Sequence, residues 1–195
     1  MKLSHLFVLS AAAVVPMGAL AADPQIDIRT NMGTIRLELY PAKAPKTVEN
    51  FLQYVRDGHY NGTTFHRVID GFMIQGGGFD GTFKQKPTRA PITNEAQSGV
   101  KGGIKNDLGT IAMARTADPN SATAQFFINV NDNSFLNWGD PRSDGNGYAA
   151  FGKVVSGMDV VNKIAKTATG GGGPFPRDVP KQPVVIEAVT VVGAK

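Results

Sequence analysis

The chain has 195 residues, among them 23 glycines, 12 prolines and no cysteine, and its formal net charge is +4. Without cysteine it has no disulfide framework, no thiolate zinc site and no cysteine nucleophile. The basic residues are scattered and do not form the stripe that is typical of nucleic-acid-binding proteins, so we expect no nucleic-acid partner. Glycine and proline make up about 18% of the residues, against roughly 12% in an average protein. This excess favours a turn-rich fold of short strands.

The first 21 residues have the pattern of a secretory signal peptide. Lys2 is followed by an apolar run over residues 6–15, and residues 19–21 form the small-x-small pattern of a cleavage site. The run is shorter than the ~20 residues of a membrane span, and Pro16 follows it directly. A lipoprotein is excluded because it requires a lipid-bearing cysteine. We expect a mature domain of residues 22–195 that is exported to the periplasm and is not held in the membrane.

The mature chain shows the pattern of one all-β domain. Two helices are predicted, one from the apolar face of Val48, Phe51, Leu52 and Val55, and one over residues 158–165. Eight antiparallel strands of this size close naturally into a barrel, so the predicted fold class is a closed eight-stranded antiparallel β-barrel capped by two α-helices. The predicted strands cover residues 25–30, 34–39, 64–68, 72–75, 109–114, 125–130, 148–155 and 184–192. The glycine run 170–173 with Pro174 is expected to be a flexible surface loop.

Residues 65–78 are the densest motif of the chain. Two strand-like pieces flank Asp70–Gly71, which is a strong signal for a hairpin turn. Strict alternation along the first piece predicts Phe65 and Arg67 on one face and His66 and Val68 on the other.

The same hairpin predicts a surface pocket. Arg67 is expected to lie beside Met73 and Gln75 across the hairpin, and an arginine and an amide grouped with apolar residues are typical of a binding pocket. Phe126 and Phe127 are adjacent on a later strand, so one should fill the barrel while the other faces outward.

Several other chemistries lack support. His59 and His66 are seven residues apart with no third ligand at metal spacing, so we expect no metal site. A hydrolase triad lacks its Gly-x-Ser-x-Gly elbow, and the glycines 76–78 are not followed by the Lys-Ser/Thr of a phosphate loop. No cofactor is expected.

Three segments in combination resemble the cyclophilin-type peptidyl-prolyl cis-trans isomerases. They are FHRVIDGFMIQGG at 65–77, the pair Met113-Ala114 followed by QFFI at 125–128, and FGKVVSGM at 151–158. The resemblance covers about residues 27–192 and is strongest to bacterial periplasmic cyclophilins. It implies an isomerase of X–Pro peptide bonds (EC 5.2.1.8), a monomer that binds proline-containing polypeptides and assists the folding of exported proteins.

The resemblance also implies roles for individual residues. Arg67 would be the main catalytic residue, together with Gln75. The substrate-binding residues would be Phe72, Met73, Ala114, Arg115, Thr116, Gln125, Phe127, Phe135, Leu136 and Tyr148. The chain departs from the family pattern at Phe135, where the family often has Trp, and at Tyr148, where many eukaryotic members have His. The loop at Arg115 is one residue longer than the common pattern. Because Phe135 lacks an indole N–H, we expect weakened binding of cyclosporin-type cyclic peptides.

Two other functions stay open at this level. A cyclophilin-like barrel can bind proline-containing segments or unfolded chains as a non-catalytic chaperone. A lipocalin-like carrier also has eight strands, but it needs an open apolar interior.

Overall fold

The structure is a computed structural model that describes residues 23–193. The predicted signal peptide, residues 1–21, lies outside the described residues. Among the residues described, no helix is both long enough and apolar enough to cross a membrane. The elements in chain order are β1 (Gln25–Thr30), β2 (Gly33–Leu39), α1 (Pro45–Arg56), β3 (Thr63–Thr64), β4 (Arg67–Ile69), β5 (Met73–Gly76), α2 (Ala96–Lys101), β6 (Thr110–Met113), β7 (Phe126–Asn129), the 3₁₀ turn η1 (Ser134–Leu136), β8 (Ala150–Ser156), α3 (Met158–Ala165), β9 (Thr169–Gly172), β10 (Phe175–Pro180) and β11 (Val185–Val191).

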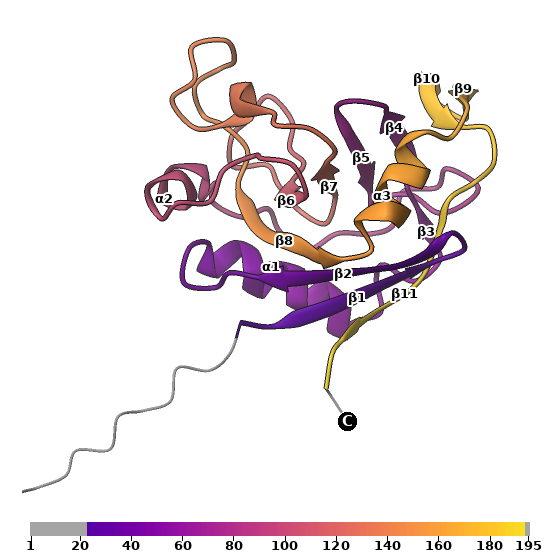
Figure 1. The fold of residues 1–195 in the computed structure, drawn as a ribbon, viewed down its shortest axis with the longest axis horizontal. Coiled ribbons are helices and arrows are strands. Elements are labelled where there is room, and N and C mark those ends of the chain that lie inside the picture. Colours follow the sequence, from indigo (N-terminus) through magenta and orange to yellow (C-terminus); the bar gives the residue numbers. More distant parts are fainter. Residues whose placement is uncertain (1–22, 194–195) are drawn as a thin grey trace, which may run out of the picture.

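Nine strands form one curled antiparallel sheet. Their order is β3-β11-β1-β2-β8-β6-β7-β5-β4. The two end strands, β3 and β4, are separated in the chain only by Phe65 and His66, so the sheet curves back toward itself (Figure 1). Counted as one interrupted strand, β3 and β4 bring this sheet to the eight strands that the sequence predicts. The predicted mainly-β class is confirmed.

The core lies inside the curl of the sheet and under α1. The helix face that the periodicity predicted is buried, with Val48, Phe51, Leu52 and Val55 all among the core residues. The Phe51 ring centroid lies 5.1 Å from that of Tyr60 and 5.2 Å from that of Phe151. Phe126 meets Phe51 edge-on at 5.7 Å. Aromatic side chains of the described residues therefore pack in the interior, unlike the open apolar interior that a lipocalin-like carrier needs.

The strict alternation predicted for residues 65–68 is wrong. Phe65 and Val68 both belong to the core, whereas Arg67 is half-buried on the outer side. The reason is that residues 65 and 66 lie outside regular strand, so the period of two is broken there. His66 is buried outside the main core, with its ring 4.7 Å from Phe79 and 5.4 Å from Phe175.

Two further elements differ from the prediction. The glycine run expected to be a loop forms part of the β9–β10 hairpin. A side-chain carbon on Gly173 would overlap the Phe83 ring, and one on Gly172 would lie 3.0 Å from it, so these glycines let Phe83 pack against the hairpin. The short helix α2 and the turn η1 were not predicted at all, so the helix count of two was too low.

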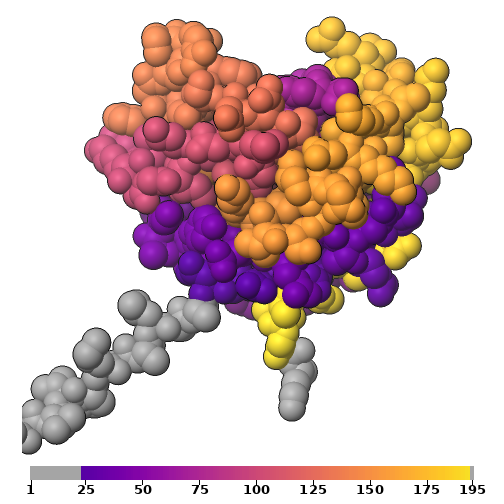
Figure 2. All heavy atoms as spheres, viewed as in Figure 1, coloured from indigo at the N-terminus to yellow at the C-terminus, as the bar shows by residue number. Residues whose placement is uncertain are grey.

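The outer edge of the molecule is notched beside the β4–β5 hairpin. One side of the notch is loop 137–147, drawn in orange, and the other is the β9–β10 hairpin, drawn in yellow (Figures 1 and 2). β10 contacts β4 directly. The hairpin that carries Arg67 is thus bordered by two projecting segments.

Candidate active site

The β4–β5 hairpin places the predicted catalytic pair face to face. Gly71 has a φ of +71° in the turn, and Arg67 is the cross-strand partner of Gln75. The Arg67 Nη1 donates a hydrogen bond to the Gln75 Oε1 at 3.3 Å. The Gln75 Nε2 donates in turn to the Gln125 Oε1 at 3.1 Å. The predicted hairpin, and the predicted proximity of Arg67 to Gln75, are confirmed.

A hollow of about 160 Å³ lies beside this pair. Two arginines and a glutamine share its lining with apolar and aromatic side chains. The lining residues are Arg67, Phe72, Met73, Gln75, Ala114, Arg115, Phe127, Leu136 and Tyr148. A larger hollow of about 230 Å³ lies between residues 64–66 and the β9–β10 hairpin, but no arginine lines it. The hollow of about 160 Å³ is the candidate active site, because it combines Arg67 and Gln75 with apolar side chains of the predicted site.

The neighbours Phe126 and Phe127 take opposite faces of β7, as predicted. Phe126 is fully buried in the main core. Phe127 belongs to a separate cluster with Met73 and Leu136, which forms the floor of the hollow. The Tyr148 ring stands edge-on to Phe127 with centroids 5.7 Å apart.

Three predicted site residues lie outside the lining. The Gln125 side chain accepts a hydrogen bond from Gln75, and its carbonyl oxygen accepts one from the Ala114 N–H at 3.0 Å. Phe135 stacks on Phe72, with ring centroids 5.7 Å apart and planes 26° apart, and so extends the apolar wall outward. Thr116 is exposed, and its hydroxyl donates to the Ser121 Oγ at 2.8 Å.

Asparagines that the sequence analysis missed hold the backbone of the walls. The Asn106 Nδ2 donates to the carbonyl oxygens of Leu136 and Tyr148, both at 3.1 Å. The Asn133 Nδ2 donates to the Phe72 carbonyl oxygen at 2.8 Å. Both asparagines are buried, and nothing in their local sequence indicates these partners, which are brought in by the fold.

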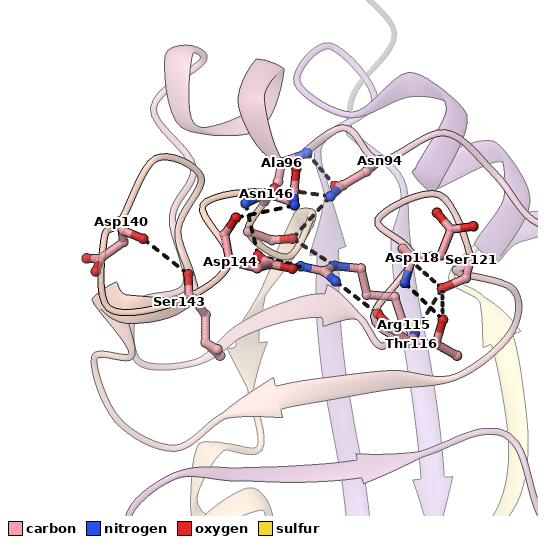
Figure 3. Close-up of polar contacts among 12 residues, drawn as sticks. Asn94, Ala96, Arg115, Thr116, Asp118, Ser121, Asp140, Ser143, Asp144 and Asn146 are labelled. Carbon is pink, nitrogen blue, oxygen red and sulfur yellow. Dashed lines mark hydrogen bonds and ion pairs between the residues drawn. The ribbon is translucent and has the colours of Figure 1, made fainter.

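Loop 137–147 is tied to the site by polar contacts that the sequence analysis also missed (Figure 3). Asp144 pairs with Arg115 at 2.7 Å, and this hydrogen-bonded partner lowers the pKa of the Asp144 carboxyl. The Asn94 Nδ2 donates to the carbonyl oxygens of Asn146 and Gly147, both at 3.1 Å. These partners lie 29 to 53 positions apart in the sequence, so no spacing pattern could have revealed them.

The electrostatics of the site centre on Arg67. None of the ion pairs formed among residues 23–193 involves Arg67. The adjacent His66 has its pKa lowered to about 4, chiefly because it is buried, with the positive charge of Arg67 as a smaller cause. His66 is therefore neutral at pH 7, and Arg67 has no ion-pair partner among the described residues. Within the described part of the chain, no group of three His, Asp or Glu side chains could hold a metal ion.

Comparison with known proteins agrees with this geometry. The family model described as cyclophilin type peptidyl-prolyl cis-trans isomerase/CLD matches residues 25–191. A peptidyl-prolyl cis-trans isomerase of Streptomyces antibioticus is 57% identical over 168 residues, which are 86% of this chain and 98% of the relative. Peptidyl-prolyl cis-trans isomerase B of Escherichia coli (strain K12) is 57% identical over 166 residues, 85% of this chain and 98% of the relative. A crystal structure of a Cryptosporidium parvum cyclophilin-type isomerase, obtained in the presence of the dipeptide Ala-Pro, matches with a TM-score of 0.70 and 27% identity, over 87% of this chain and 99% of that one.

Proposed function

The chain belongs to the cyclophilin-type peptidyl-prolyl cis-trans isomerases, and from this premise we propose that Arg67 catalyses rotation about X–Pro bonds in exported polypeptides. The observation that carries the proposal is the Arg67 guanidinium, which forms no ion pair among the described residues and is held by Gln75 at the edge of a mostly apolar hollow.

The chemical task is to lower a rotational barrier. Amide resonance gives the peptide C–N bond a barrier of about 18–20 kcal/mol, and an X–Pro bond interconverts in roughly tens to hundreds of seconds. Raising the rate from ~10⁻² s⁻¹ to ~10³ s⁻¹ requires about 7 kcal/mol. No proton has to move and no covalent bond has to form.

Arg67 suits this task because the twisted state differs from both planar states. When the amide twists, conjugation is lost and the prolyl nitrogen regains a lone pair. A donor directed at that nitrogen stabilises the twisted state more than either ground state, which is the requirement for catalysis. The guanidinium stays charged and carries five N–H donors, of which one goes to Gln75. The remaining donors are available to the nitrogen and to a nearby carbonyl.

The apolar part of the hollow would hold the proline ring while the rest of the peptide turns. The residues assigned to this role are Phe72, Met73, Phe127 and Leu136, all of which line the hollow. Ala114 and Tyr148 complete the walls, and Gln75 with Gln125 orients Arg67.

The natural substrates in this proposal are exported proteins that are still folding. The support is the signal-peptide pattern of residues 1–21, which would deliver a monomeric isomerase to the periplasm. Mass spectrometry of a periplasmic fraction should then find a chain that begins at residue 22. A full-length chain confined to the cytoplasm would refute the localisation.

The test of Arg67 is NMR exchange spectroscopy on an Ala-Pro peptide. Because removal of one well-placed donor costs about 10²–10³ in rate at comparable sites, we expect Arg67→Ala to lose at least 100-fold in catalysed exchange. Arg56→Ala, at the exposed end of α1, is the matched control and should keep full activity. Near-wild-type exchange in Arg67→Ala would refute the catalytic role of Arg67. A wild-type protein that binds the peptide without accelerating its exchange would instead favour a non-catalytic binder of proline-containing segments.

A further inference from the structure

Arg115 lines the active-site hollow, yet its charge is satisfied within the protein. The Arg115 Nη2 donates to both carboxylate oxygens of Asp144, at 3.0 and 2.7 Å. The Nε donates to the Gly147 carbonyl oxygen at 3.0 Å, and the Nη1 to the Thr116 carbonyl oxygen at 2.9 Å. Only 3% of the Arg115 side chain is exposed, against 41% of the Asp144 side chain. Every nitrogen of the guanidinium thus has a protein acceptor, as Figure 3 shows.

The positions of these acceptors show which segment of the chain Arg115 fixes. Two of them, at Asp144 and Gly147, lie on the returning half of loop 137–147. This loop is joined at its base by the hydrogen bond from the Tyr148 N–H to the Leu136 carbonyl oxygen at 2.9 Å. Both residues of that base line the hollow. Arg115 therefore fixes the segment that leads directly into Tyr148.

Arg115 also contacts Tyr148 directly. The guanidinium carbon lies 4.4 Å from the centroid of the Tyr148 ring, which is the geometry of a cation–π contact. The ring also meets Phe127 edge-on at 5.7 Å. Tyr148 is thus packed between Arg115 and the floor of the hollow.

We propose that Arg115 is a positioning residue, which uses Asp144 as its counter-charge to hold Tyr148 against Phe127 and so shapes the pocket for the proline-containing segment. The inference rests on the proposed function, because it takes this hollow as the peptide-binding site. It differs from direct substrate recognition, in which the Arg115 charge would contact the bound peptide.

Asp144→Asn separates these two roles, because they predict opposite signs. If the guanidinium recognises substrate, removing its carboxylate partner frees donors, and peptide binding is kept or strengthened. If it positions Tyr148, the weaker hold on the loop weakens binding. Charge-assisted hydrogen bonds such as these two from Nη2 are stronger than neutral ones, so we expect the Kd for an Ala-Pro peptide to rise about three- to tenfold, measured by NMR titration. Asp144 itself does not line the hollow.

Asp140→Asn is the matched control. Asp140 lies in the same loop and accepts hydrogen bonds from the Arg142 Nε at 2.9 Å and Nη2 at 2.7 Å. It is not among the hydrogen-bond partners of Arg115 in the described residues. We expect less than a twofold change in Kd. The single tryptophan, Trp138, also lies in this loop, so its fluorescence in urea titrations verifies that each variant is folded.

A double-mutant cycle shows whether the effect passes through Tyr148. Tyr148→Phe keeps the ring and should leave the response to Asp144→Asn intact, whereas in a Tyr148→Ala background Asp144→Asn should change the Kd less than twofold. Tighter or unchanged binding in Asp144→Asn, an equal loss in Asp140→Asn, or a full effect in the Tyr148→Ala background would each overturn the proposal. If wild-type protein binds the peptide but does not accelerate its exchange, the proposed function fails while these Kd values still test the role of Arg115.

Discussion

Arg67 on β4 lies directly opposite Gln75 on β5, and the guanidinium donates to the glutamine carbonyl at 3.3 Å. The Gln75 Nε2 in turn donates a hydrogen bond to the Gln125 Oε1 at 3.1 Å. Three side chains from three neighbouring segments therefore form one hydrogen-bonded chain that ends at Arg67. A substitution that moves the Gln125 side chain should therefore affect the position of Arg67, even though Gln125 does not line the hollow.

Gly78→Ala tests this chain from a distance. An added Cβ at Gly78 would lie 2.6 Å from the Gln125 Cδ and 2.9 Å from its Nε2. The Gln125 side chain must therefore move, and the hydrogen bond from Gln75 is lost. We expect kcat/KM to fall about three- to tenfold, because a hydrogen bond contributes about 0.5–1.5 kcal/mol. The free energy of unfolding should change little, since only a flexible side chain has to shift.

The control for this variant is Gly81→Ala, where an added Cβ meets no atom within 4 Å and activity should be unchanged. Gln125→Ala should reproduce the loss seen in Gly78→Ala, and the double variant should add nothing further. Independent, additive losses would contradict a shared chain through Gln125.

Phe126→Leu and Phe127→Leu should have opposite consequences. Phe126 packs in the core against Phe51, Tyr60 and Phe65, so its replacement should lower the free energy of unfolding by about 1–2 kcal/mol while the folded fraction keeps its KM. Phe127 lines the hollow, so its replacement should raise KM severalfold at a smaller cost in stability. Urea denaturation of each variant measures its free energy of unfolding, and exchange kinetics measure its KM. The same profile in both variants would contradict their placement on opposite faces.

The sequence was sufficient where local patterns decide the structure. The 3.6-residue period of Val48, Phe51 and Val55 predicted the buried face of α1, and the pair Phe126–Phe127 predicted one inward and one outward ring. The Asp70–Gly71 turn predicted the hairpin that brings Arg67 to Gln75. Each of these signals depends on neighbours within a few residues or across one tight turn.

The features that the sequence did not predict depend on contacts between segments that are distant in the chain. The Glu95 carboxylate accepts hydrogen bonds from the Lys46 and Thr47 N–H groups at 3.1 and 2.8 Å, so it caps α1 from 48 residues away. The glycines of β9 looked like a loop because glycine disfavours strands, but the Phe83 ring packs against Gly172 and Gly173. The contact of Asp144 with Arg115 is equally remote in sequence. No local period encodes such pairs.

Phe135→Trp should strengthen inhibition by cyclosporin-type cyclic peptides. Phe135 extends the apolar wall through its stack on Phe72 but offers no donor. An indole N–H at this position supplies one for a peptide carbonyl, and a hydrogen bond of about 0.5–1.5 kcal/mol should lower the inhibitory concentration roughly three- to tenfold. Titrations of both proteins, each normalised to its own uninhibited rate, provide the measurement. Equal inhibition of the two proteins would refute the prediction.

His66 should make the fold sensitive to mild acid. Its pKa is lowered by burial from 6.5 to about 4, so between these pH values the unfolded chain binds a proton that the folded chain does not. The free energy of unfolding should therefore fall as the pH decreases from about 6.5 to 4, by up to about 3 kcal/mol at 1.36 kcal/mol per pH unit.

Because the His66 Nδ1 has no hydrogen-bond partner among the described residues, His66→Leu removes no bond at that atom and keeps an apolar side chain between Phe79 and Phe175. Urea denaturation at pH 7 and pH 4.5 should show a clearly smaller acid loss in His66→Leu than in the wild type. His59, whose pKa burial also lowers, is present in both proteins and contributes equally to each. Equal acid losses in the two proteins would show that His66 is not the group that takes up the proton.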